Sequence, residues 1–404
     1  MENKSKNTTD SNKKNLFSKI LFFIIFIFII FLLIQYIKSP SMWDFRNNLY
    51  LPLELLTNQQ SPYAIQSVTS GTNALWLPMA FGFFLPLGFV TFNIASKIWL
   101  LLNISALVII VWISTREKRP SPILLGIILL VICIFPSTIS HMILGQISIL
   151  VCLSMLLIIV YFQKLPDWAL GILISFALIK PQLSVFFIPA LFYVIYLLQG
   201  WKRVLSVLKW ALFAIIISIL PVFLYYPGWI PDFISNLSIN PDWYHPSLVN
   251  LVPFLLKFGR PILSVGMIAF GIITTLFIIY INYQKMSEKL SLNRNYKIEN
   301  SLIWILALTP IFSPYIWSWD FILIYPLMAF QVFKFKKPKN LFFMFAGYLI
   351  ILILYIIQKL SGQDDDLFYW WVPWGLLAVT IIFNWIMNFK KIGSSRNEKR
   401  IGPN

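Results

Sequence analysis

Asp44 is the residue whose type and position best suit acid–base chemistry. It lies in the run SMWDFR (residues 41–46), a few residues after a long apolar run near the start of the chain. A carboxylate at a membrane surface can accept the proton of a hydroxyl group within hydrogen-bond reach, and partial desolvation by Trp43 and Phe45 would raise its basicity. A lone aspartate can equally cap a following helix. Residue type alone leaves both roles open.

Metal and nucleotide chemistry have little support in the sequence. His141 and His245 are the only histidines, and they show neither HxxxH nor His/Asp spacing. Cys133 and Cys152 lie inside apolar runs, as small buried hydrophobic residues do. There is no GxGxxG or P-loop motif, and the acidic run 364–366 is typical of a solvated turn. We therefore expect no metal and no other cofactor.

These residues are set in a strongly apolar chain. Of its 404 residues, 59% are hydrophobic, and the mean hydropathy is +0.78. Many apolar runs approach the roughly 20 residues that cross a bilayer. The formal charge of +17 comes from short basic clusters between these runs, which is typical of membrane topology signals rather than of nucleic-acid binding. The composition predicts an all-α, polytopic protein of the cell membrane.

The apolar runs predict about twelve transmembrane helices with both termini in the cytoplasm. The predicted spans are residues 20–37, 98–115, 122–139, 147–163, 167–179, 182–199, 208–226, 261–282, 300–313, 319–333, 341–358 and 369–388. Lysine and arginine clusters then fall in alternate loops, as the positive-inside rule requires. The segment 75–92 is apolar enough to span, but its prolines and glycines favour an interfacial or re-entrant helix pair.

This topology divides the chain into three parts. A basic cytoplasmic tail (1–19) precedes the transmembrane domain (20–388), and a second basic tail (389–404) follows it. The first outer loop, residues 38–97, carries Asp44 on the side opposite both tails.

A series of short motifs follows Asp44 on this predicted outer side. They are Asp44-Phe45, Leu49-Tyr50, Leu55-Leu56, Ser61-Pro62-Tyr63, Trp76 to Leu87 with two prolines, Gly145-Gln146, Lys180-Pro181 and Ser313-Pro314-Tyr315-Ile316-Trp317. Each motif is weak alone. Their order and common side resemble the polyprenyl-phosphate-mannose-dependent mannosyltransferase family of the GT-C membrane glycosyltransferases. The resemblance covers most of residues 20–335.

The resemblance implies a GT-C-like fold, an active site at the outer leaflet and an inverting reaction. A polyprenyl-phosphate sugar, with mannose as the first choice of hexose, would be the donor, and a lipid or glycan the acceptor. Asp44 matches the family's catalytic aspartate by position. Family members often carry histidine just after the Ser-Pro-x-x-Trp element, whereas this chain has Ser318-Trp319-Asp320. Asp320 is therefore the candidate replacement.

A phosphate leaving group needs cationic or amide donors, and the predicted outer boundary has few. Lys180 is the best placed, because it interrupts an apolar region beside Pro181, where an uncompensated ammonium would be costly. Arg46, Arg260 and Lys257 follow. A snorkelling or ordinary boundary role fits each of these cations as well.

Sugar or acceptor binding is expected of six polar and aromatic residues. They are Tyr50, Tyr63, Gln146, His245, Trp317 and Asp320. Gln146 can instead make a capping or interhelical hydrogen bond, and His245 can belong to an interfacial aromatic belt.

Two other classes of protein share parts of this pattern. A lipid or oligosaccharide flippase or transporter is the alternative function, although no acidic residue lies in the middle of a predicted span, where coupled transporters usually need one. A polysaccharide ligase or polymerase would carry a longer late outer loop with arginine and histidine.

Overall fold

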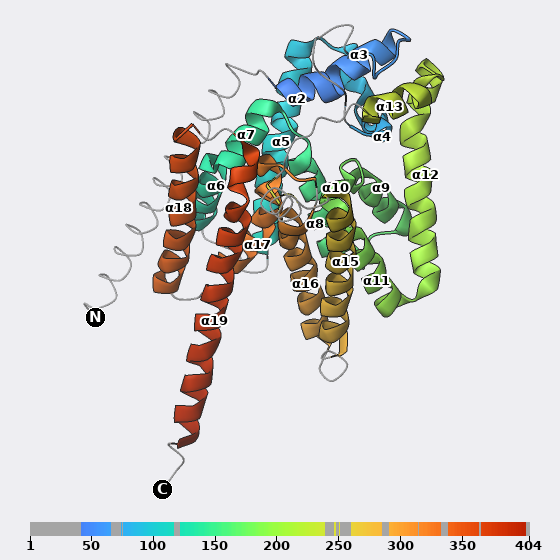
Figure 1. Ribbon diagram of the computed structural model, residues 1–404. Helices are drawn as coiled ribbons and strands as arrows, with labels where there is room; N and C mark the ends of the chain where they lie inside the picture. Colours follow the sequence, from blue (N-terminus) through green and yellow to red (C-terminus); the bar gives the residue numbers. More distant parts are fainter. Residues whose placement is uncertain are drawn as a thin grey trace, which may run out of the picture.

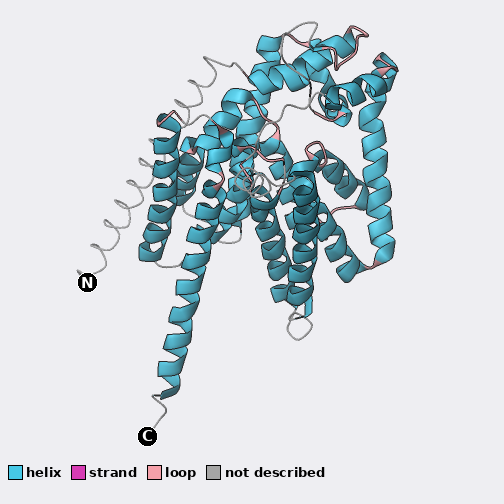
Figure 2. Ribbon diagram, viewed as in Figure 1, coloured by secondary structure: helices cyan, strands magenta, loops and turns pink. Residues whose placement is uncertain are grey.

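The computed structural model is helical throughout the part of the chain that it describes. That part comprises residues 42–65, 74, 76–116, 122–238, 246–247, 250, 260–284, 291–313, 315–332, 338–362 and 365–400. Figure 2 shows helices and loops but no strand in these ranges, which confirms the all-α class. The predicted tail 1–19 and the predicted span 20–37 lie outside the described residues.

Short helices precede and separate the longer ones. In chain order the elements are α2 (Trp43–Phe45), η1 (Arg46–Tyr50), α3 (Leu51–Thr57), α4 (Pro78–Phe84), η3 (Leu85–Phe89), α5 (Phe92–Thr115), α6 (Pro122–Ile134), α7 (Pro136–Leu144), α8 (Ser148–Tyr161), α9 (Asp167–Ala177), α10 (Pro181–Ser184), α11 (Phe187–Gln199), α12 (Trp201–Tyr225), α13 (Trp229–Ser238), α15 (Arg260–Gln284), α16 (Ser291–Phe312), η5 (Ser318–Ile324), α17 (Tyr325–Val332), α18 (Pro338–Leu360), η6 (Asp366–Tyr369) and α19 (Trp371–Arg400).

Within the residues that the structure describes, four helical segments are long and apolar enough to cross a membrane. They lie in α5, in α12, in α18 and in η6 with α19, and the pair α6 and α7, bent by 65°, makes up to five. The predicted count of twelve is not confirmed. Helices α8, α9 and α11 have 14, 11 and 13 residues. At about 1.5 Å per residue they measure about 16–21 Å, against a hydrocarbon core of about 30 Å.

Within the predicted re-entrant segment 75–92, the residues Pro78–Phe89 form a short, broken helical segment. Helix α4 begins at Pro78, which suits a first helical turn because its missing N–H would have no partner there. Pro86 lies in the 3-10 helix η3 that follows. The apolar segment Pro78–Phe89 is shorter than the roughly 20 residues of a full span. Its length agrees with the predicted interfacial or re-entrant pair.

One end of the molecule gathers the short helices of the first loop. Figure 1 shows α2, α3, α4 and α13 together at the top, while α19 runs away from the body at the opposite end. Phe45 of α2 is fully buried and stacks on Trp99 of α5, with ring centroids 4.9 Å apart. Such an aromatic pair anchors the start of the described chain onto α5. The residue before Phe45 is Asp44, so this packing also fixes the candidate base.

Candidate active site

Asp44 is buried although it lies next to an exposed tryptophan. It occupies α2, after Met42 in a left-handed conformation with φ 32°, and it is 8% exposed. Burial raises the pKa of Asp44 to about 6, and the charge of Lys180 and the hydrogen bond from Gln146 limit the rise. A carboxyl group with this pKa is largely ionised at neutral pH yet a stronger base than an exposed aspartate.

Both oxygens of Asp44 accept a hydrogen bond from a side-chain amide. Asn48 Nδ2 donates to Oδ1 at 3.0 Å, and Gln146 Nε2 donates to Oδ2 at 2.5 Å. Each carboxylate oxygen has two lone pairs, so a further donor such as a substrate hydroxyl can still be accepted. The two amides therefore orient the carboxylate without exhausting its capacity.

The position of Gln146 depends on the glycine before it. Helix α7 ends at Leu144, and the next residue, Gly145, has φ 71° in the left-handed region that glycine adopts freely. A Cβ at Gly145 would lie 2.6 Å from Phe45 Cβ. The Gly145 carbonyl also accepts the indole N–H of Trp99 at 2.8 Å. The Gly-Gln pair thus brings the end of α7 against the helix that carries Asp44.

Lys180 lies in the break between α9 and α10 and is only 6% exposed. Its Nζ donates to Gln146 Oε1 at 2.8 Å, to Ser148 Oγ at 2.9 Å and to Asp320 Oδ1 at 3.2 Å. The ammonium is therefore compensated by Asp320, in a buried ion pair. Its burial does not fit the snorkelling role considered from the sequence, and the cost of a buried ammonium is offset by a carboxylate of the protein.

Asp320 completes the network from the C-terminal half of the chain. It is 0% exposed, and its Oδ2 accepts the backbone N–H of Trp317 at 3.1 Å at the start of η5. Its Oδ1 accepts two hydrogen bonds, one from the hydroxyl of Ser148 and one from Lys180 Nζ. Asp44 and Asp320 are thus joined by a continuous chain of hydrogen bonds through Gln146 and Lys180.

Asp366 supports this turn from outside the network. Its Oδ2 accepts the backbone N–H of Ser318 at 2.8 Å. The prediction that 364–366 is a solvated turn is wrong for Asp366, because its carboxylate is engaged by the loop that carries Asp320. Asp365 is exposed and caps its own 3-10 helix through Leu367 N, at 3.0 Å.

Three aromatic residues pack together in the segment that leads to Asp320. Trp317 stacks on Trp319, with centroids 4.8 Å apart and an interplanar angle of 11°, and Tyr315 packs edge-on against Trp317 at 6.3 Å. Burial raises the pKa of Tyr315, as do the charges of Asp320 and Asp44, whereas a hydrogen bond with Trp317 lowers it. Tyr315 therefore lies within electrostatic range of both carboxylates.

Other predicted site residues do not join the network. The hydroxyl of Tyr50 donates to Val90 O at 3.1 Å, and Tyr63 packs between Phe81 and Phe233. Both tyrosines are therefore buried within the first-loop packing rather than in contact with the carboxylates.

Of the other predicted cations and the two histidines, the structure describes the side chains of Arg46 and His141 only. Arg46 is exposed, two residues after Asp44. Helix α15 begins at Arg260, whose side chain lies outside the described residues, as do His245 and Lys257. His141 is buried, and its Nε2 lies 3.0 Å from Asn103 Oδ1 in the core. Within the described ranges, no three histidine, cysteine, aspartate or glutamate side chains cluster as a metal site would require.

Sequence reasoning missed two members of the network and one residue that supports it from outside. Asn48 is four residues after Asp44, the spacing at which two side chains meet on one helical face, so it could have been found. Ser148 is two residues after Gln146 and carried no separate signal. Asp366 lies 48 residues beyond its partner Ser318, and no local pattern indicates that contact.

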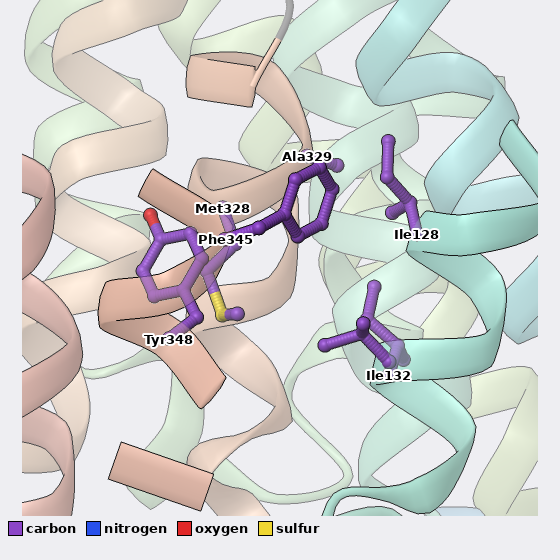
Figure 3. A pocket seen from close by; sticks show the side chains of 7 residues that line it. Ile128, Ile132, Met328, Ala329, Phe345 and Tyr348 are labelled. Atoms are coloured by element: carbon purple, nitrogen blue, oxygen red, sulfur yellow. The ribbon is translucent and has the colours of Figure 1, made fainter. Parts of the chain in front are cut away.

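An apolar pocket lies apart from this network. Figure 3 shows Ile128 and Ile132 of α6 facing Met328 of α17 and Phe345 of α18. Its lining, which also includes Val131, Ala329 and Tyr348, contains none of the network residues. The Tyr348 hydroxyl is engaged with Thr380 at 2.7 Å. This pocket therefore lacks the polar groups that would orient a sugar.

Comparison with known proteins gives one match. The family model described as glycosyltransferase family 87 matches residues 74–314, which is more than half of the chain. No curated protein and no solved structure matches. The matched range includes Gln146, Ser148 and Lys180, while Asp44, Asp320 and Asp366 lie outside it.

Proposed function

Because the chain belongs to glycosyltransferase family 87, a family of GT-C-like membrane glycosyltransferases, we propose that it transfers a hexose from a polyprenyl-phosphate donor to a lipid or glycan acceptor. Mannose is the first candidate, from the resemblance of the outer motifs. The observation that carries the proposed chemistry is a buried aspartate with both oxygens oriented by amides. General bases in enzymes are held and tuned in this way.

The proposed reaction is a single inverting displacement. The acceptor oxygen attacks the anomeric carbon as Asp44 takes the hydroxyl proton, the bond from that carbon to the phosphate oxygen breaks, and polyprenyl phosphate leaves with the electron pair. Trp317 and Asp320 are proposed to contact sugar or acceptor, together with Gln146. No metal or other cofactor is part of this proposal.

The reaction is proposed to take place on the face opposite the cytoplasmic termini. Asp44 lies among the short helices at one end of the molecule, and the C-terminal end of α19 lies at the other (Figure 1). Arg46 is exposed beside Asp44, so it is a candidate for the phosphate, with Arg260 as a second. A cation at the membrane surface can meet the phosphate of a lipid whose chain stays in the bilayer.

The test compares Asp44→Asn with Glu54→Gln, an exposed carboxylate of the same loop. The purified protein in nanodiscs is given polyprenyl-phosphate mannose and a glycolipid acceptor, and product is followed by mass spectrometry. Asp44→Asn should lose about 100-fold to 10,000-fold in kcat with donor binding retained, whereas Glu54→Gln should stay near wild type. Full activity of Asp44→Asn would remove Asp44 as the base. A wild-type protein that moves lipid across the membrane but never transfers sugar would favour the flippase alternative.

A further inference from the structure

The ammonium group of Lys180 has no donor left for a ligand. A lysine has three N–H donors, and Gln146, Ser148 and Asp320 accept one each at 2.8, 2.9 and 3.2 Å. A phosphate oxygen could bind Lys180 only by displacing one of these partners. Displacing Gln146 would leave its buried Oε1 without this hydrogen bond, and displacing Asp320 would break the buried ion pair, both of which are unfavourable.

Lys180 also determines how the amide of Gln146 is turned. Because an ammonium only donates, the oxygen Oε1 must face Lys180, and the amide nitrogen Nε2 then faces Asp44 Oδ2 at 2.5 Å. An ionised Asp44 also favours the amide nitrogen, so Lys180 and Asp44 select the same orientation from opposite sides, and without Lys180 the amide is held from one side only. The position of the donor to Asp44 is therefore secured in part by a cation that does not touch Asp44.

We propose that Lys180 is a positioning residue for the base, which acts on Asp44 through Gln146 and is itself held by Asp320 and Ser148. This inference deepens the proposed function and rests on Asp44 being the base. It assigns Lys180 a different role from the phosphate ligand predicted from the sequence. Arg46, exposed two residues after Asp44, is left as a phosphate candidate.

The charges around Asp44 agree with this role. Lys180 lowers the pKa of Asp44 from between α9 and α10, and Asp320 of η5 raises it by a smaller amount. Tyr315, in the segment before η5, and His141 of α7 are the other titratable groups that interact with Asp44 or Lys180. The hydrogen bond from Gln146 also lowers the pKa of Asp44. Removal of Lys180 or Gln146 should therefore raise this pKa.

The kinetic test uses Lys180→Met, Gln146→Met, the double variant and Lys97→Met, a control at an exposed lysine of the same predicted outer side. With polyprenyl-phosphate mannose as donor, Lys180→Met should lower kcat about 10-fold to 100-fold and change the donor KM little. Gln146→Met should do the same. The double variant should be no worse than either single variant, because both break the same relay, the contacts from Lys180 through Gln146 to Asp44. Additive losses, or a large rise in donor KM with kcat retained, would overturn the positioning role.

A second measurement does not depend on sugar transfer. Dicyclohexylcarbodiimide reacts with protonated carboxyl groups in apolar surroundings, and mass spectrometry of the peptide that carries Asp44 gives its titration midpoint. The wild-type midpoint should be about 6. It should rise by about one unit in Lys180→Met and Gln146→Met but not in Lys97→Met. Gln146→Met leaves the Lys180–Asp320 pair intact, so it still tests the relay if Lys180→Met fails to fold.

The two measurements separate the inference from the proposed function. An unmoved midpoint in Gln146→Met overturns the relay, whether or not the protein transfers sugar. If the midpoint rises as expected in Lys180→Met and Gln146→Met while the wild-type protein transfers no sugar, the contact from Lys180 through Gln146 to Asp44 is supported and Asp44 is rejected as the base of a glycosyltransferase.

Discussion

Gln146 donates its side-chain amide to Asp44 at 2.5 Å, although the two residues are 102 positions apart in the chain. The contact joins the end of α7 to the short helix α2. It is possible because Gly145 lets the backbone of the α7 terminus approach Phe45. The position of the candidate base is therefore set by a neighbour that is remote in sequence, and local features of residues 41–46 do not determine it.

The pKa of Asp44 gives a pH dependence for the reaction. A general base must be ionised, so kcat should fall as the pH drops through about 6, the value to which burial raises this pKa. The same shift means that protonated Asp44 is favoured in the folded state, so its contribution to stability is lost as the pH rises through that value. The kcat–pH profile of the purified protein measures the first effect. Glu54→Gln should leave the profile unchanged, and an acid limb near pH 4 would contradict the assignment, since an exposed carboxylate has a pKa of about 4.

Gly145→Ala should disturb both folding and activity. The added Cβ would lie 2.6 Å from Phe45 Cβ and 3.2 Å from Met42 Cβ, in a backbone conformation that alanine disfavours. We expect a loss of about 3 kcal/mol of unfolding free energy, from the left-handed conformation and from overpacking together. Thermal unfolding in detergent measures this loss. Gly362→Ala has φ 79° with open space around it, so it should lose only about 1 kcal/mol. Equal losses in both variants would show that the contact with Phe45 is unimportant.

The helical class could be predicted from the sequence because apolar composition and helix breaks are local properties. The number of spans could not, because an apolar run between two breaks predicts a helix but not its tilt or length. Pro136 illustrates this limit, since the predicted span 122–139 covers α6 and only the first residues of α7, which begins at Pro136 and is bent by 65° from α6. Most of the apolar side chains of α8 are buried against neighbouring helices.

The candidate site was partly predictable for a similar reason. Asp44, Gln146, Lys180 and Asp320 were selected by residue type and motif order, and the structure brings these four side chains together. Their chemical roles remain proposals. Tyr50 was selected by the same motifs, yet its hydroxyl bonds to a carbonyl in the loop packing. A motif predicts which residues lie near a site, but it does not predict which of their side chains point into it.

Close helix packing should make Gly171 sensitive to substitution. A Cβ at Gly171 of α9 would lie 2.6 Å from the carbonyl carbon of Trp210 in α12, and backbone atoms cannot move aside as a flexible side chain can. Gly171→Ala should therefore destabilise the protein by about 1–3 kcal/mol. Gly266→Ala in α15 has nothing within 4 Å and should be neutral or stabilising by up to about 1 kcal/mol. Unfolding temperatures of the two variants compare these effects, and a stabilised Gly171→Ala would contradict the packing of α9 on α12.

Asp366 should act on the reaction through the backbone of η5. Its carboxylate accepts the N–H of Ser318, between the stacked Trp317 and Trp319 and two residues before Asp320. Asp366→Ala removes the acceptor, so the turn should loosen and kcat should fall about tenfold through misplacement of Asp320 and hence Lys180. Asp366→Asn keeps an acceptor oxygen and should retain most of the activity.

Asp365→Ala provides the matched control for this prediction, because Asp365 is exposed and caps only its own 3-10 helix. It should lose no more than about 1 kcal/mol of stability and little kcat. If Asp366→Asn loses as much activity as Asp366→Ala, the charge of Asp366 is needed and a hydrogen bond to Ser318 alone does not explain its role. Asp366 lies outside the residues matched to family 87, so a loss in Asp366→Ala would show that the C-terminal helices contribute to the site.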